Sequence, residues 1–167
     1  CGFRRVDETK ALLAGLGVPA LAPFLEALQQ GGLRSLFERV MTVPAADRAP
    51  LVTAVVAACA SRPPAGFAAE CANAVALEQA YPGDVGVIGA LLLNHVTLKP
   101  GEALALGAGN LHAYLEGTGV ELMANSDNVL RGGLTPKHVD VPELLRVLDF
   151  TDGPVTIVSP RGAPEAT

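Results

Sequence analysis

Residues 112–137 read HAYLEGTGVELMANSDNVLRGGLTPK, and this stretch decides how the rest of the chain is interpreted. Glycines divide it into short runs, and its apolar residues alternate with the two-residue period of β-strands. The pattern predicts strands over Ala113–Leu115 and Gly119–Ala124. The same stretch carries four side chains suited to metal binding, proton transfer or anion binding: His112, Asp127, Arg131 and Lys137.

The residues just upstream predict a β-hairpin. Leu91–Leu98 is typical of a strand, and Ala103–Leu106 of the strand that returns beside it. Between them, Lys99-Pro100-Gly101-Glu102 places Pro and Gly where a type II turn needs them. Downstream, a helix over Val141–Leu148 begins with Pro142 in its first turn, and Val155–Val158 predicts one more strand. Short strands with glycine-rich turns favour a sandwich or jelly roll over alternating β and α units.

Upstream of Tyr81-Pro82-Gly83-Asp84 the period changes, and apolar residues recur at helical spacing. Glycines stand where helices can end, and prolines stand where they can begin. We therefore expect a helical module over residues 1–80, a second unit over 81–150 and a terminal strand or tail over 151–167. The predicted helices are Lys10–Leu16, Ala20–Gln29, Leu33–Met41, Asp47–Ala60 and Ala65–Ala80.

The composition excludes several classes of function. The 167 residues are 50% apolar and 17% charged, which is enough to form a core and excludes a disordered chain. The net charge of −5 gives no basic surface for nucleic acid or anionic membranes. The longest apolar stretches fall short of the roughly 20 residues of a membrane span.

The three cysteines predict no disulfide framework. Cys1, Cys59 and Cys71 show no CxxC spacing and leave one thiol over in any pairing. Cys59 and Cys71 lie in Ala- and Val-rich stretches, where a free thiol behaves as a small apolar side chain. The expected compartment is the reducing cytoplasm.

The run from Gly101 through Gly107-Ala108-Gly109 to His112 resembles the second metal-binding motif of the cupins. In that family, a Gly, a tight Pro-x-Gly turn and a His bring an imidazole into the mouth of a small barrel. Gly107 departs from the usual Pro, and Glu116 stands where Asn is common. A single His in such a setting is also often a hydrogen-bonded structural residue, and both interpretations stay open.

The whole stretch from His112 to Lys137 is similar to the signature of the type I phosphomannose isomerases, with Gly132 in place of the usual Ala. The resemblance is strong over residues 81–150, weaker over the helical segment and lost after Thr151. The flanks that share it are Tyr81-Pro82-Gly83-Asp84-Val85-Gly86, Leu93-Asn94-His95, Leu98-Lys99-Pro100-Gly101-Glu102-Ala103 and Cys1-Gly2-Phe3-Arg4.

The resemblance implies a zinc-dependent enzyme that interconverts mannose 6-phosphate and fructose 6-phosphate by moving a proton between C1 and C2 through an enediol. Such an enzyme feeds mannose into nucleotide-sugar synthesis, as for GDP-mannose, or into glycolysis. Carried over by position, His112 becomes a zinc ligand and Arg131 the catalytic cation. Asp127 would handle a proton or orient Arg131, and Lys137 would neutralise the sugar phosphate.

The family draws its other zinc ligands, a Gln, a His and a Glu, from a segment upstream of the helical module. This chain offers no Gln-x-His arrangement. We therefore expect an internal fragment with an α+β fold, in which a small all-α helical module precedes part of a cupin-like β jelly roll. A jelly roll without its early strands leaves edges unpaired, so the chain should fold poorly or self-associate, whereas the intact protein is expected to be a monomer.

Other interpretations remain for the same residues. Asp127 and Arg131 are also spaced as an ordinary loop ion pair, and Lys137 could be a solvated loop residue. Lys99, His95 and His138 are expected to be structural or exposed. For the whole chain, the alternatives are a non-catalytic cupin-like sugar-binding or regulatory module, or an isomerase of another sugar phosphate.

Overall fold

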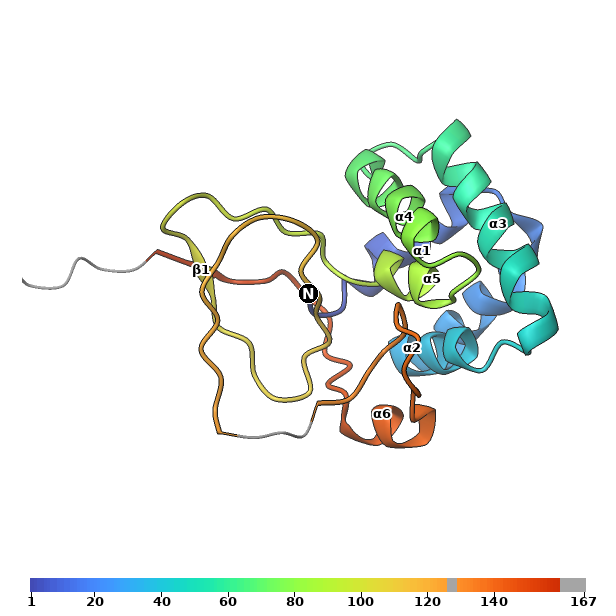
Figure 1. Cartoon of the computed structure of the whole chain (residues 1–167). Helices are drawn as coiled ribbons and strands as arrows, with labels where there is room; N and C mark the ends of the chain where they lie inside the picture. The colour runs from blue at the N-terminus through green and yellow to red at the C-terminus, as the bar shows by residue number, and fades with distance from the viewer. Residues whose placement is uncertain (126–128, 160–167) are drawn as a thin grey trace, which may run out of the picture.

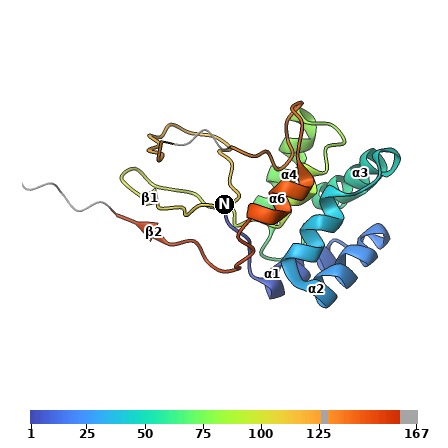
Figure 2. The ribbon, with the colours of Figure 1, turned by 90° about the horizontal axis from the view of Figure 1, so that it is seen from below.

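The computed structural model describes residues 1–125 and 129–159, and it divides into a helical end and an extended end (Figure 1). Helices gather at one end, while long loops and two very short strands form the other. Seen from below, β1 and β2 run side by side away from the helices, and α6 lies against α2 (Figure 2). The fold is therefore mostly helical within the described residues.

The predicted helical blocks of the first half are confirmed. α2 runs through two of them, but its φ and ψ angles are non-helical at Gly31 and Gly32, where φ is −137° and +66°. The helix is therefore interrupted where the glycine pair predicts a stop. The elements are α1 (Val6–Gly15), the 3-10 turn η1 (Pro19–Leu21), α2 (Ala22–Met41), α3 (Ala45–Ser61) and α4 (Ala68–Ala80).

One helix, α5 (Gly86–Leu91), forms where the sequence analysis predicts no element, and it meets the predicted strand only at Leu91. The expectation of a strand over Leu91–Leu98 is wrong, because the chain leaves α5 there and makes only an isolated bridge from Leu93 to Phe3. The run from Val85 to Leu92 is apolar throughout and almost entirely buried. Such a run has no polar face, so its period cannot separate a buried helix from a buried strand.

The predicted hairpin has the right turn and the wrong partner. The Glu102 amide donates to the Lys99 carbonyl at 2.9 Å, and Gly101 has φ +86°, as a type II turn requires. The returning strand is β1 (Ala103–Leu104), and it pairs antiparallel with β2 (Ile157–Val158). The hairpin prediction is therefore wrong, because the terminal segment takes the place of residues 91–98.

The predicted strands over Ala113–Leu115 and Gly119–Ala124 do not form. Residues 112–125 are all exposed and lack regular secondary structure. A strand needs a neighbour for its backbone hydrogen bonds, and an extended segment without one stays a loop. Of the later predictions, the helix is confirmed as α6 (Val141–Val147) with Pro142 in its first turn, and the strand at Val155–Val158 shortens to β2. The division of the chain at residue 80 stays a prediction.

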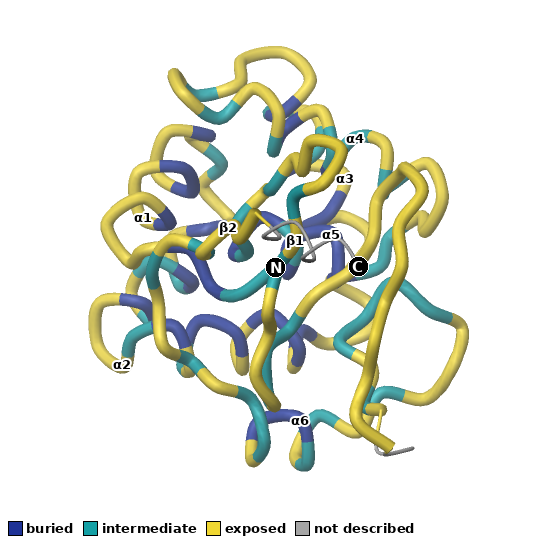
Figure 3. Tube along the Cα trace, turned by 90° about the vertical axis from the view of Figure 1, so that its left-hand side faces the viewer, coloured by how far each residue is buried: buried dark blue, intermediate teal, exposed yellow. Residues whose placement is uncertain are grey.

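The core forms around Phe3, which lies close to the junction of the two ends. Its ring stacks on Phe150 at a centroid distance of 5.0 Å and meets Phe37 edge-on at 5.7 Å. Figure 3 shows that buried positions concentrate in the helices, while the loops of the extended end are exposed. Residues 1–4 therefore join elements that are far apart in sequence.

The backbone beside Phe3 is held on two sides. The Arg4 amide donates to the Leu92 carbonyl at 2.9 Å, and the Gly153 amide donates to the Phe3 carbonyl at 3.2 Å. The side-chain amide of Asn94 lies 3.3, 3.1 and 2.9 Å from the carbonyl oxygens of Gly2, Phe3 and Gly153. Asn94 thus joins three segments of backbone at one point.

Arg4 is a buried charge that is only partly paired, since its Nη1 has no hydrogen-bond partner among the described residues. Its guanidinium pairs with Glu70 at 3.1 Å, donates to the Leu93 carbonyl at 2.9 Å and lies 5.2 Å from the ring centroid of Phe67. Burial lowers the pKa of Arg4, and the nearby carboxylate of Glu70 opposes that shift. The pair connects residue 4 to α4, and breaking a buried pair of this kind leaves one charge uncompensated.

The cysteines follow the sequence prediction. All three are free, and Cys59 and Cys71 are buried on α3 and α4. Burial raises the pKa of Cys59 to about 12, with a smaller effect from Cys71, so its thiol stays protonated.

No single helix in the described chain is long and apolar enough to cross a membrane. Only Pro19–Met41 and Ala45–Ser61 taken together meet that requirement, with a bend of 113° between them.

We predict that Phe3→Ala destabilises the fold by about 3–5 kcal/mol, because it removes a buried ring that contacts two others. Urea denaturation measures the change. The control is Met123→Ala, since Met123 is 70% exposed and should change the free energy of unfolding by less than about 0.5 kcal/mol. Equal effects of the two substitutions would contradict the central place given to Phe3.

Candidate functional site

A tight turn precedes His112 and is fixed to the end of α6. The Asn110 amide lies 3.4 Å from the Gly107 carbonyl that accepts from it, and Gly109 has φ +77°. The Asp149 amide donates to the Gly109 carbonyl at 3.0 Å, and a Cβ added at Gly109 would lie 2.6 Å from the Val147 carbonyl oxygen. Glycine is therefore required at position 109 by both its backbone angle and its contact with α6.

His112 is the first residue of the exposed segment after this turn. Its Nδ1 lies 2.7 Å from the backbone carbonyl oxygen of Asn110. The preceding residue, Leu111, accepts a hydrogen bond from the Gly2 amide at 2.9 Å. The imidazole thus stands on an anchored backbone but is itself exposed.

Arg131 is exposed, and its neighbour Gly132 connects it to the histidine segment. A methyl group added at Gly132 would lie 2.8 Å from Cδ1 of Leu111. The side chain of Leu111 therefore packs directly on the backbone of Gly132, and the segments that carry His112 and Arg131 lie next to each other. The absence of a side chain at Gly132 leaves room for this contact. Asp127 lies outside the described residues.

Asp84 ties the segment after Arg131 to the helical end. One carboxylate oxygen accepts from the Leu134 amide at 2.9 Å, and the other accepts from the Gly86 amide at 2.7 Å. A Cβ at Gly133 would lie 2.8 Å from the Cα of Gly86, so the two backbones are in close contact. Sequence reasoning gave Asp84 no role. Its position two residues before the first residue of α5, typical of an Asx turn, was the available signal.

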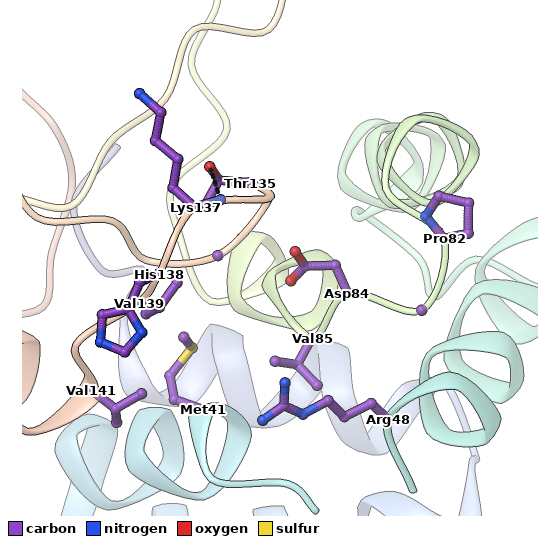
Figure 4. Close-up of a pocket in the computed structure, with 12 residues that line it drawn as sticks. Met41, Arg48, Pro82, Asp84, Val85, Thr135, Lys137, His138, Val139 and Val141 are labelled. Carbon is purple, nitrogen blue, oxygen red and sulfur yellow. Dashed lines mark hydrogen bonds between the residues drawn. The ribbon is translucent and has the colours of Figure 1, made fainter. Parts of the chain in front are cut away.

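A pocket of about 440 Å³ lies beside Asp84 (Figure 4). Its other walls are Met41 and Arg48, from the end of α2 and the start of α3, and the segment 135–141 that leads into α6. Arg48, Asp84 and His138 supply polar groups to its lining, and Met41 and Val85 supply apolar ones. The Nε of Arg48 donates to the Val43 carbonyl at 2.9 Å.

Lys137 belongs to the rim of this pocket. Its backbone amide donates to the Thr135 hydroxyl at 3.2 Å, and its exposed side chain points away from the wall formed by Arg48 and Met41 (Figure 4). The structure thus places Lys137 near Asp84, six residues beyond Arg131, and among the described residues no carboxylate forms an ion pair with it. Its predicted role at the sugar phosphate stays a prediction.

The described residues do not provide a complete zinc site. A catalytic zinc usually takes three protein ligands, and residues 1–125 and 129–159 contain no group of three or more His, Cys, Asp or Glu side chains that could hold a metal. His112 fits as one ligand, because its ring is exposed and its backbone is held. The roles of His112, Arg131 and Lys137 as site residues stay predictions.

Comparison with known proteins gives a consistent set of relatives. No family model matches the chain. It is 38% identical over 170 residues to the mannose-6-phosphate isomerase of Bos taurus, with 92% of this chain and 40% of the relative covered. It is also 38% identical over 155 residues to the enzyme of Escherichia coli, with 91% and 38% covered. The chain thus spans about 40% of the length of these curated relatives.

Solved structures agree with this. The mannose 6-phosphate isomerase of Salmonella typhimurium, solved with fructose 6-phosphate and zinc bound, superposes with a TM-score of 0.82 and 34% identity. The superposition covers 97% of this chain and 41% of that structure. The unliganded form of the same enzyme also matches with a TM-score of 0.82. The fold described above is therefore that of one part of a larger protein structure.

We predict that Asp84→Ala releases the segment 131–139 from the helical end, because the Leu134 and Gly86 amides lose the carboxylate oxygens that accept from them. Hydrogen–deuterium exchange followed by mass spectrometry should show faster exchange at the Leu134 amide and unchanged exchange in α1. Asp47→Ala, which removes an exposed carboxylate from the first turn of α3, is the control. Unchanged protection of Leu134 in the Asp84 variant would refute the proposed tie.

Proposed function

We infer that this chain, a homologue of the mannose-6-phosphate isomerases over about 40% of their length, supplies part of the active site of a zinc-dependent sugar-phosphate isomerase. The complete enzyme would interconvert mannose 6-phosphate and fructose 6-phosphate. The observation that carries this inference is the superposition of nearly the whole chain on a relative solved with fructose 6-phosphate and zinc. The motif from His112 to Lys137 supports the same function.

In this proposal, the residues of the chain have separate roles. His112 holds the metal as one of several ligands, and a zinc ion at that position would polarise the sugar oxygens. Arg131 places a permanent positive charge where the enediolate develops negative charge. Asp127 orients Arg131 or handles a proton, and Lys137 binds the sugar phosphate as a point charge.

The remaining ligands are proposed to come from the rest of the polypeptide, as strands of a cupin-like jelly roll. The support is the exposure of large apolar side chains on the extended end. Val120 and Leu122 are 94% and 95% exposed, and Tyr114 is 76% exposed. An exposed apolar surface of this kind marks an interface. Added strands would cover it and would pair with the loop over residues 112–125.

A non-catalytic sugar-binding module remains the second candidate, because residues 1–125 and 129–159 bring together no group of three or more His, Cys, Asp or Glu side chains that could hold a metal. The two differ in whether the complete protein carries a Gln-x-His and a Glu upstream of the helices. For the enzyme, we propose a cytoplasmic monomer.

Nothing in the sequence distinguishes the stereochemistry at C2 of the sugar, so an isomerase of another sugar phosphate remains within the enzyme proposal.

We predict that Arg131→Ala in the complete protein lowers kcat on the order of 10²–10³-fold, with a much smaller change in KM, because its charge acts on the enediolate. A coupled assay with mannose 6-phosphate measures both constants. Arg146→Ala is the matched control, since Arg146 is exposed on α6 and paired with Glu143. An unchanged kcat for the Arg131 variant would remove it from the catalytic role.

A further inference from the structure

The contact between His112 and Asn110 determines which ring nitrogen carries the proton. Nδ1 of His112 lies 2.7 Å from the Asn110 carbonyl oxygen. A carbonyl oxygen only accepts hydrogen bonds, so Nδ1 must be the donor. In a neutral imidazole, the other nitrogen then has the free lone pair. The geometry thus selects the Nδ1–H tautomer, which is the less populated form of an unconstrained histidine side chain.

We propose that the backbone carbonyl of Asn110 is the positioning group of His112, which holds the ring in the Nδ1–H tautomer and leaves Nε2 as the nitrogen that coordinates metal. The metal part of this inference rests on the proposed function. A ligand whose other nitrogen is already hydrogen-bonded has its tautomer and orientation fixed before metal arrives.

The Asn110 carbonyl can fix the His112 ring because hydrogen bonds hold the backbone at Asn110 and at both of its neighbours, Gly109 and Leu111. Gly109 is fixed against the end of α6 by the Asp149 amide. Asn110 closes the turn onto Gly107. Leu111 is bound by the Gly2 amide, which belongs to the segment packed into the core. The acceptor therefore keeps its place although His112 itself is exposed.

The other two histidines provide an internal reference. His95 and His138 are both exposed, and neither ring has a hydrogen bond to another described residue. We expect both to populate mainly the Nε2–H tautomer of free histidine. His112 should differ from both, because within the described part of the chain it alone has a carbonyl oxygen against its Nδ1.

Nuclear magnetic resonance tests the proposal directly. Multiple-bond ¹H–¹⁵N spectra of the complete protein, stripped of metal, labelled at histidine and recorded at mildly alkaline pH, report which ring nitrogen carries the proton. His112→Gln assigns the resonances by loss of one set. We expect the Nδ1–H pattern for His112 and the Nε2–H pattern for His95 and His138. A predominant Nε2–H pattern at His112 would overturn the proposal, and this wild-type spectrum decides without any other variant.

Two substitutions in the turn distinguish a specific effect of the Asn110 carbonyl on His112 from a general change in the structure of the turn. Gly109→Ala adds a Cβ at φ +77° and against the Val147 carbonyl, so it should displace Asn110 and shift His112 toward the Nε2–H pattern. Gly107→Ala lies in the same turn but meets nothing within 4 Å, and it should leave the His112 pattern as in wild type. Equal shifts in the two variants would overturn the assignment to the Asn110 carbonyl.

The tautomer is measured without metal, so its outcome is separate from that of the proposed function. If His112 is in the Nδ1–H form but the complete protein takes no zinc, the positioning role stands and the isomerase proposal fails. If the complete protein binds zinc but His112 is in the Nε2–H form, the isomerase proposal stands and the positioning role fails.

Discussion

The side-chain amide of Asn94 is the interaction on which the candidate site depends. It contacts the carbonyl oxygens of Gly2, Phe3 and Gly153, which lie 92, 91 and 59 residues away in sequence. By holding residues 2 and 3, it places Phe3 in the core and directs the Gly2 amide to the carbonyl of Leu111. The backbone that presents His112 is therefore attached to the helical core through a segment more than 100 residues earlier.

The second half of the site is attached by different groups. Asp84 holds the backbone after Arg131, and Leu111 packs on Gly132 between the two candidate residues. The contacts use backbone amides and small residues, so they fix the course of the chain and leave the candidate side chains His112 and Arg131 exposed. This arrangement suits a site that is completed by other parts of a larger protein, because the exposed side chains remain available to a second surface.

The helices could be predicted from the sequence because their stabilising contacts are local and their apolar stripes repeat. α5 could not, since its run from Val85 to Leu92 is buried on every side and has no period. The strands predicted over residues 113–115 and 119–124 do not form, for another reason. Alternation of apolar and polar residues indicates an extended backbone, but it does not show which neighbouring strand would accept and donate the backbone hydrogen bonds. The motif predicts roles for His112 and Arg131, which stay predictions. Asp84 and Asn94 act through contacts 50 to 92 residues away, which spacing along the chain does not reveal.

The central claim is that this chain supplies one metal ligand and the catalytic arginine, and that the other ligands lie elsewhere in the complete protein. Zinc analysis of the isolated 167-residue chain after dialysis, together with a coupled mannose 6-phosphate assay, tests it most directly. The account predicts far less than one zinc ion per chain and negligible turnover. Stoichiometric zinc with clear turnover by this chain alone would contradict it.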